Sequence, residues 1–304
     1  MTEAPPVVGE EGAASPPERG KVPTRILEFF FFPLVMVAVG VGVFVLFGLI
    51  TTEGKRPRDY VSLIRSGDSN RRWQAAFELS KVIGSGKDAR AADPRLVGDM
   101  VSLFKDAEGD DPRVRRFLAL ALGRLGDSQA VPTLLEYVKG VRRGEGNDPE
   151  THVYAVWALG AIGDQSAVPE LVALAGHDDP GLRKTAVHAL GAFRSADATA
   201  ALQTSLGDAV GDVRWNAAAA LAHRGDLSAV PVLEEMLDRE RLGRGSEGMT
   251  SEQTEEILLQ AVAGAAFLHD PRLDARLTAL SSDDPSLKVR AAARRGLERK
   301  SVSP

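Results

Sequence analysis

The chain has 304 residues, of which 44% are apolar, a formal net charge of −5 and no cysteine. The negative charge argues against a strongly basic nucleic-acid-binding protein. The lack of cysteine excludes disulfides, thiolate catalysis and cysteine-based zinc sites. The apolar content is sufficient for one elongated domain with short appendages.

The first segment, residues 1–25, is rich in Pro, Gly, Glu and Ala and has no apolar periodicity. Such a composition cannot bury enough apolar surface to offset the entropy lost on folding. We therefore expect a disordered tail over residues 1–25.

An apolar segment follows at residues 26–52, and its uncharged part, Phe29 to Ile50, is 22 residues long. At 1.5 Å per residue this run would reach about 33 Å, enough for a hydrocarbon core of roughly 30 Å. It is also longer than the ~7–15 apolar residues of a cleaved signal peptide. The sequence thus predicts one transmembrane helix and a single-pass membrane protein. Lys and Arg are enriched after the run, which favours a cytoplasmic location for the rest of the chain.

After a linker at residues 53–58, one pattern recurs through residues 59–300. A Leu followed by a small residue stands seven residues after a basic residue, and the Leu residues at 159, 190 and 221 are 31 apart. The basic position is occupied by Arg72, Arg115, His152, Arg183, Arg214 and Arg290. A repeat of this kind indicates a stack of similar structural units.

Each unit has the periodicity of a helical hairpin. Positions 3, 7 and 10 after the basic residue share one helical face, as Leu118, Leu122 and Leu125 do. An Asp four residues before the basic position, often followed by Pro, is a helix N-cap, and Gly-Asp marks the helix end. Because one hairpin cannot bury its apolar faces alone, we predict an all-α fold, an α-solenoid of about seven stacked hairpins.

The expected helix pairs are 59–66 with 69–83, 94–105 with 112–125, 128–139 with 149–162, 165–175 with 180–193, 197–206 with 211–223, 228–238 with 251–268, and 272–280 with 285–299. Two insertions, 140–148 and 239–250, are expected to be loops that project from one edge of the stack. Their arginines are interpreted as solvated.

Residues 111–134, DPRVRRFLALALGRLGDSQAVPTL, carry a pattern that resembles the short HEAT-like repeats of the phycobilisome-lyase class. The resemblance covers about residues 59–300. It implies a solenoid that serves as an interaction scaffold. It also implies an alternative, a tetrapyrrole (bilin) lyase-like or chaperone activity on a chromophore protein.

The Asp and Arg positions recur once per repeat, which favours a structural ladder over an anion-binding strip. In this ladder each Asp caps its helix and accepts a hydrogen bond from an Arg of a neighbouring repeat. The expected ladder residues are Asp68, Arg72, Asp111, Arg115, Asp179, Arg183, Arg214 and Arg290.

No motif for chemistry is found in the sequence. The five histidines, at 152, 177, 188, 223 and 269, include no H-E-x-x-H pair and no His-Glu dipeptide. There is no G-x-S-x-G, P-loop or dinucleotide-binding motif. We therefore predict no catalytic residue, no metal, no cofactor and no small-molecule substrate.

The positions one and five after the basic residue share a helical face and vary between repeats. Aromatic and basic residues of this row are candidates for binding a protein partner, since Trp and Arg dominate interface hot spots. The candidates are Trp73, Phe77, Arg116, Trp157, Lys184, His188 and Trp215. The alternative is that the Trp side chains fill gaps between repeats. The sequence-based hypothesis is a membrane-anchored scaffold or accessory subunit that binds a protein through its inner surface.

Overall fold

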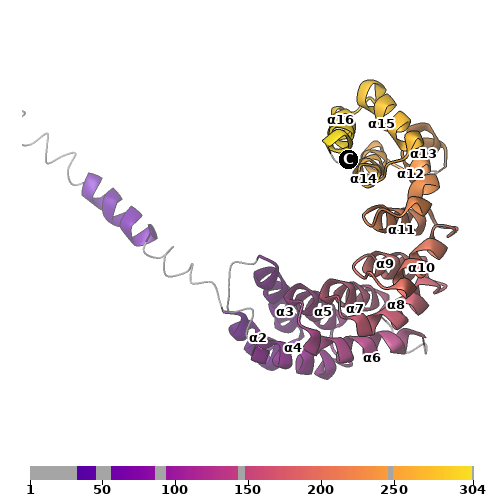
Figure 1. The fold of residues 1–304 in the computed structure, drawn as a ribbon. Coiled ribbons are helices and arrows are strands. Elements are labelled where there is room, and N and C mark those ends of the chain that lie inside the picture. Colours follow the sequence, from indigo (N-terminus) through magenta and orange to yellow (C-terminus); the bar gives the residue numbers. More distant parts are fainter. Residues whose placement is uncertain (1–32, 46–55, 86–93, 143–147, 246–248, 303–304) are drawn as a thin grey trace, which may run out of the picture. The chain divides into compact units, whose positions relative to one another are not determined.

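A computed structural model of the chain describes residues 33–45, 56–85, 94–142, 148–245 and 249–302 (Figure 1). The chain divides into two compact units, Met1–Gly54 and Lys55–Pro304, which are treated separately. The predicted tail at 1–25 lies outside the described residues, as do residues 53–55 of the predicted linker.

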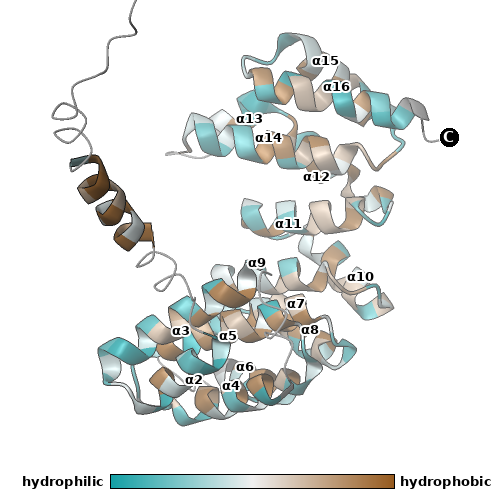
Figure 2. Cartoon of the chain, turned by 90° about the vertical axis from the view of Figure 1, so that its left-hand side faces the viewer, coloured by the Kyte–Doolittle hydropathy of each residue, from teal (hydrophilic) through white to brown (hydrophobic). Residues whose placement is uncertain are grey.

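The first unit contains one described helix, over residues 33–45, whose residues are apolar (Figure 2). Its 13 residues extend about 20 Å, short of the roughly 30 Å of a hydrocarbon core. Across the described ranges, no helix has both the length and the apolar character needed to cross a membrane. The predicted transmembrane helix at 26–52 and the single-pass membrane assignment are therefore wrong. The cytoplasmic orientation, which depended on that helix, loses its basis. The two ends of the predicted span, 26–32 and 46–52, lie outside the described residues.

The regular elements among the described residues of the second unit are all helices. Its α-helices are α2 (Pro57–Ser66), α3 (Ser69–Gly84), α4 (Pro94–Asp106), α5 (Pro112–Leu125), α6 (Val131–Arg142), α7 (Pro149–Ile162), α8 (Val168–Ala175), α9 (Pro180–Leu190), α10 (Ala196–Ser205), α11 (Gly211–Ala222), α12 (Val230–Met236), α13 (Arg239–Gly245), α14 (Ser251–Ala265), α15 (Pro271–Asp283) and α16 (Leu287–Val302). Three short 3-10 helices precede α6, α8 and α12: η2 (Ser128–Ala130), η3 (Gln165–Ala167) and η4 (Leu227–Ala229).

The helices pair as hairpins that stack along one direction. The pairs are α2 with α3, α4 with α5, α6 with α7, α8 with α9, α10 with α11, α12 with α14, and α15 with α16. The second helices α3, α5, α7, α9, α11 and α14 follow one another along the inner side of the stack (Figure 1). The prediction of an all-α solenoid is confirmed.

Several second helices begin at an Asp N-cap and end at a Gly. The side chains of Asp111, Asp148 and Asp179 accept hydrogen bonds from backbone N–H groups of the first helical turn, and a Pro follows each of them. At their C-terminal ends, α5 and α7 stop at Gly126 and Gly163, whose φ angles of 69° and 75° are left-handed and favour glycine.

The first helices of three repeats begin later than expected, at Val131, Val168 and Val230 rather than at 128, 165 and 228. The Asp of each Gly-Asp turn accepts a hydrogen bond from the N–H two residues on, as Asp127 does from Gln129. This local bond caps one tight 3-10 turn before the α-helix starts, and the turn is closed by the backbone bond from the N–H three residues on, as from Ala130 to the carbonyl oxygen of Asp127.

Close approach of successive second helices depends on small residues. A Cβ atom added to Gly160 of α7 would lie 2.7 Å from the Cα of Ala189 in α9, and one added to Gly123 of α5 would lie 2.8 Å from the Cα of Ala158 in α7. The Leu residues beside them, such as Leu122 and Leu159, are fully buried. Glycine thus lets the backbones of neighbouring repeats nearly touch while leucine fills the core behind them.

The insertion at 239–250 was expected to be a loop, but its first seven residues form α13. Leu242 of this helix is buried in a small cluster with Leu258 and Val289. Arg239 is not solvated: its Nη2 lies 2.9 Å from the carboxylate of Asp284, whose side chain is 1% exposed. Residues 143–147 of the other insertion lie outside the described residues.

Candidate functional site

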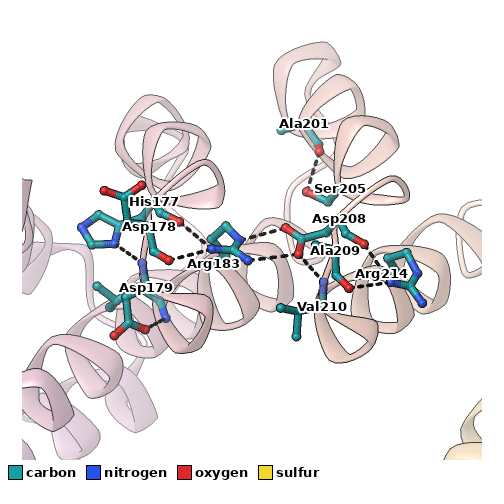
Figure 3. A network of polar contacts seen from close by, with 11 residues as sticks. His177, Asp178, Asp179, Arg183, Ala201, Ser205, Asp208, Ala209, Val210 and Arg214 are labelled. Carbon is teal, nitrogen blue, oxygen red and sulfur yellow. Dashed lines mark hydrogen bonds and ion pairs between the residues drawn. The ribbon is translucent and has the colours of Figure 1, made fainter. Parts of the chain in front are cut away.

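In several repeats the basic residue binds the turn of its own hairpin. Nη1 of Arg183 donates to the carbonyl oxygens of His177 and Asp178, both at 2.9 Å. Nε and Nη2 of the same side chain donate to the carboxylate of Asp208, at 2.8 and 3.1 Å (Figure 3). Arg183 therefore joins the turn of one hairpin to the turn of the next.

The same arrangement recurs at Arg214, which donates to the carbonyl oxygens of Asp208 and Ala209 (Figure 3). Arg214 also donates to Glu235 of α12 at 2.6 Å. Arg115 donates to the carbonyl of Phe104 at 2.9 Å, and Arg290 to that of Asp284 at 2.6 Å. These arginines satisfy carbonyl groups at or after helix C-termini, which have no partner within the helix.

The carboxylates that pair with arginines of neighbouring repeats are mostly not the N-caps. Arg72 pairs with Asp110 at 2.9 Å and Arg183 with Asp208. Of the caps, Asp68 and Asp111 pair with arginines of their own helices, Arg71 and Arg113, and Asp179 accepts from the N–H of Leu182. Asp148 both caps α7 and accepts from Arg116 of α5 at 3.2 Å.

These ion pairs shift the carboxyl pKa values. Hydrogen bonds from the Arg183 side chain hold the pKa of Asp208 below its ordinary value, although burial acts in the opposite direction. Hydrogen bonds from Arg113 lower the pKa of Asp111 in the same way. Both carboxylates are thereby stabilised in their charged form.

The candidate partner-binding residues nearest the N-terminus already have partners within the chain. The guanidinium of Arg113 lies 4.1 Å from the ring centroid of Trp73, whose Nε1 donates to Asn70 at 3.1 Å. Phe77 packs on Phe117 with a ring separation of 5.0 Å. Arg116 is paired with Asp148 and Glu150.

Trp215 fills space between repeats. It packs against both apolar clusters of the second unit, and a Cβ added to Gly211 would lie 2.9 Å from its ring. Its Nε1 is buried and has no hydrogen-bond partner. Trp215 therefore agrees with the alternative interpretation, in which the Trp side chains fill gaps between repeats.

Trp157, Lys184 and His188 line one surface groove on the second helices. Trp157 also packs against Gly123 of α5, where an added Cβ would lie 2.7 Å from its ring. A cavity of about 410 Å³ spans α5, α7, α9 and α11, and one of about 620 Å³ spans α7, α9, α11 and α14. The two cavities share Trp157, His188 and Asn216. We name the two cavities together the inner groove.

The wall of the inner groove combines small residues with polar side chains. Small residues such as Gly160, Ala161 and Ala192 line its larger cavity. The polar side chains of that cavity are His188, Arg194, Asn216, His223, Arg224 and Gln260. Among the described residues that line either cavity, none is Asp or Glu.

Arg224 is fixed in place at the wall of the groove. Its Nη2 donates to the carbonyl oxygens of Leu190 and Gly191 at 2.8 and 3.2 Å, and its Nη1 to Oγ1 of Thr199 at 3.0 Å. Its Nε is buried without a partner. Burial, and next the positive charge of Arg194, lower the pKa of Arg224.

Arg194, His223 and Arg224 were not among the sequence candidates. His223 stands nine residues after Arg214, as Ala192 stands nine after Arg183. Positions one, five and nine of a helix are successive turns of one face. Continuing the variable row by one more turn would have reached His223.

The histidines do not gather into a metal site in the part of the chain that the structure describes, which has no cluster of three His, Asp or Glu side chains able to hold an ion. His177 accepts a hydrogen bond from the N–H of Asp179 through Nδ1. His152 is buried with its Nε2 unpartnered, and this burial lowers its pKa.

Comparison with known proteins identifies repeats between residues 114 and 239. Residues 141–212 match HEAT repeats, and residues 114–140 and 213–239 match the PBS lyase HEAT-like repeat. No curated protein sequence matches the chain.

Several solved structures are similar to the chain. In the complex of CpcE and CpcF of phycocyanin lyase from Nostoc sp. PCC7120, a chain is similar with 21% identity and a TM-score of 0.52, over 82% of this chain and 96% of that one. An archaeal HEAT-like repeats protein from Thermococcus onnurineus NA1 has 14% identity and a TM-score of 0.45, with coverages of 82% and 98%. A designed armadillo repeat protein in complex with peptide (KR)4 has 18% identity and a TM-score of 0.41, with coverages of 81% and 100%. The chain thus contains HEAT repeats and PBS lyase HEAT-like repeats, and it shares its fold with a chain of the phycocyanin lyase complex.

Proposed function

We propose that the solenoid is a protein-binding scaffold that receives a segment of a partner protein in the inner groove. The observation that carries this proposal is the sharing of Trp157, His188 and Asn216 between two cavities, which makes one surface across successive repeats. Exposed His188 and half-buried Trp157 combine apolar contact area with hydrogen-bonding groups, the combination that protein interfaces favour.

The length of the groove supports an extended segment as its occupant. The larger cavity of the groove crosses four neighbouring helices, α7, α9, α11 and α14, which have three spacings between them. At roughly 8–10 Å per spacing this part of the groove is about 24–30 Å long. An extended chain of about eight or nine residues, at ~3.3 Å per residue, would match this length.

The test uses the full chain and a displayed library of random nine-residue peptides. Peptides selected on the wild-type chain are measured again on Ala161→Tyr, which adds a ring at an exposed groove position on α7. The control, Ala173→Tyr, adds the same ring at an exposed position on α8, outside the groove.

We expect Ala161→Tyr to weaken binding of the selected peptides by about tenfold or more, the equivalent of roughly 1.4 kcal/mol, and Ala173→Tyr to leave it unchanged. Equal affinity for the two variants would place peptide binding elsewhere and contradict the proposal.

A second candidate is a lyase-like or chaperone function on a tetrapyrrole. It is supported by the likeness to a phycocyanin lyase chain and by a groove volume within the ~300–1,000 Å³ range of ligand pockets. Titration of the full chain with biliverdin or haem distinguishes it. A stoichiometric absorbance change that Ala161→Tyr abolishes would favour the tetrapyrrole, and no change would exclude it.

A further inference from the structure

The inner groove is positively charged although the chain is negative overall. The chain has 42 acidic and 37 basic residues, not counting histidine. The groove has Lys184, Arg194 and Arg224 in its wall, and no carboxylate among its described lining residues. Lys184 is paired with Asp212 at 2.7 Å, so the positive charge is concentrated at the two arginines.

Neither arginine is neutralised by an ion pair among the described residues. The guanidinium of Arg224 donates only to uncharged oxygens, those of Leu190, Gly191 and Thr199. The carboxylate of Asp226 raises the pKa of Arg224 through its charge. It accepts hydrogen bonds from the side chain of Gln203 at 2.8 Å and from the N–H of Ser228 at 2.9 Å. The influence of Arg194 on the pKa of Arg224 exceeds that of Asp226.

Two arginines in a groove wall that has no carboxylate among its described residues favour an anion that is supplied from outside. Arg224 is already immobilised by its three hydrogen bonds, so binding an anion there costs little further side-chain entropy. Arg194 is exposed and free to reorient toward a bound group.

The remaining polar groups suit the backbone of an extended chain. Gln260 offers an amide donor and an acceptor, which match the carbonyl and N–H groups of a peptide. Asn216, whose Nδ2 donates to the carbonyl oxygen of Asp212 at 2.7 Å, offers its amide oxygen as an acceptor. Small residues beside them, such as Ala192 and Ala263, leave room for that backbone to approach.

We propose that the inner groove binds an extended acidic segment of a partner protein, with its carboxylates at Arg194 and Arg224 and its apolar side chains against Trp157. This inference rests on the proposed protein-binding function and specifies the chemistry of the segment that is bound.

The test measures fluorescence anisotropy of three labelled nine-residue peptides with the full chain. One peptide alternates Glu and Ala, and the other two replace each Glu with Gln or Lys. We expect the Glu peptide to bind at least about tenfold more tightly than the Gln peptide, and its affinity to fall as salt rises. The Lys peptide should not bind.

The matched variants are Arg194→Glu in the groove and Arg71→Glu on α3, outside both cavities. Both residues are exposed and both substitutions change the net charge by the same amount. Arg194→Glu should weaken the Glu peptide by about tenfold or more, and Arg71→Glu should not change it.

Three outcomes would overturn the inference: equal affinity for the Glu and Gln peptides, equal effects of Arg194→Glu and Arg71→Glu, or tighter binding of a dT oligonucleotide than of the Glu peptide. A fourth concerns the chain's own tail. If the Glu peptide binds only after Glu3, Glu10, Glu11 and Glu18 are changed to Gln, the occupant is the tail and not a partner.

The failure of this inference is distinguishable from failure of the proposed function. Uncharged library peptides that bind the wild-type chain but not Ala161→Tyr would refute the acidic preference while supporting the groove. A Glu peptide that Ala161→Tyr binds normally would refute the groove itself.

Discussion

Arg183 and Lys184 are neighbours on α9 that make similar ion pairs in different surroundings. The pair of Arg183 with Asp208 is largely buried, with side chains 16% and 12% exposed. The pair of Lys184 with Asp212 is open to solvent, with side chains 50% and 49% exposed. Removing one partner of a buried pair leaves a charge without compensation, whereas solvent replaces a lost surface pair.

We therefore expect Arg183→Ala to lower the free energy of unfolding by about 3 kcal/mol. Lys184→Ala, as the control, should lower it by less than about 1 kcal/mol. Urea denaturation followed by circular dichroism measures both. Similar losses in the two variants would mean that the turn-to-turn contact adds no stability beyond that of a surface pair.

The same buried pair predicts a pH dependence. Because the pKa of Asp208 is lower in the folded than in the unfolded chain, its stabilising contribution is present above the unfolded pKa and is lost as pH falls through the folded pKa. The stability difference between wild type and Arg183→Ala should therefore shrink as the pH is lowered below the ordinary range of Asp. A difference that stays constant through this range would show that Asp208 does not titrate with the pair.

Contacts between successive second helices are set by the glycines at their crossings. Gly160→Ala would place a Cβ 2.6 Å from the Cβ and 2.7 Å from the Cα of Ala189, so α7 and α9 must move apart. Gly98 is the matched control, since it is also helical. A Cβ added to Gly98 would lie 3.7 Å from its nearest neighbour, the side-chain Nε2 of Gln129.

Gly160→Ala should cost about 1–3 kcal/mol of stability through overpacking. Gly98→Ala should add about 0.5–1 kcal/mol, because alanine loses less backbone entropy in a helix. Thermal denaturation of both variants gives the comparison. A stable Gly160→Ala protein would mean that the repeats can separate at this crossing without loss.

Individual helices show what could and could not be predicted from the sequence. Asp-Pro caps predicted the starts of α5, α7 and α9, since a cap acts over only a few residues. Helix α13 was missed because a charged seven-residue segment with one buried Leu242 has too few turns to show a period.

The sequence indicated which residues belong to the candidate site more readily than it indicated which groups those residues contact. The recurrence of the basic residue indicated that Arg183 is structural. It did not indicate that Arg183 binds turn carbonyl oxygens and Asp208, because the residues within reach of a side chain depend on how the repeats stack. Likewise, Trp157 and Trp215 occupy related places in the repeat and both pack beside a glycine, yet Trp157 also lines the groove and Trp215 does not. That difference arises from the neighbouring helices.

At the scale of the whole stack, each repeat is stabilised mainly by its neighbours, so a local defect should stay local. Arg239 of α13 pairs with buried Asp284 at the end of α15, and thereby joins the insertion to the final hairpin. Arg239→Ala should speed hydrogen–deuterium exchange in α15 and α16 and leave α5 and α7 unchanged.

Arg241→Ala is the control, because Arg241 is exposed and its ion pair with Glu235 is long, at 3.7 Å. It should alter exchange little anywhere. Faster exchange across the entire stack in Arg239→Ala would show that the repeats unfold as one cooperative unit.

The placement of the arginines in the turns has a consequence for how such a chain can change length. Joining Asp179 directly to Gly211 would remove 31 residues and bring Arg214 to the fourth position after Asp179, where Arg183 now stands. The incoming arginine would bring its own acceptor, Glu235, and would find the turn carbonyls of His177 and Asp178 in place. Loss of this module would therefore leave the new junction chemically complete, and evolution could shorten the surface here without redesigning it.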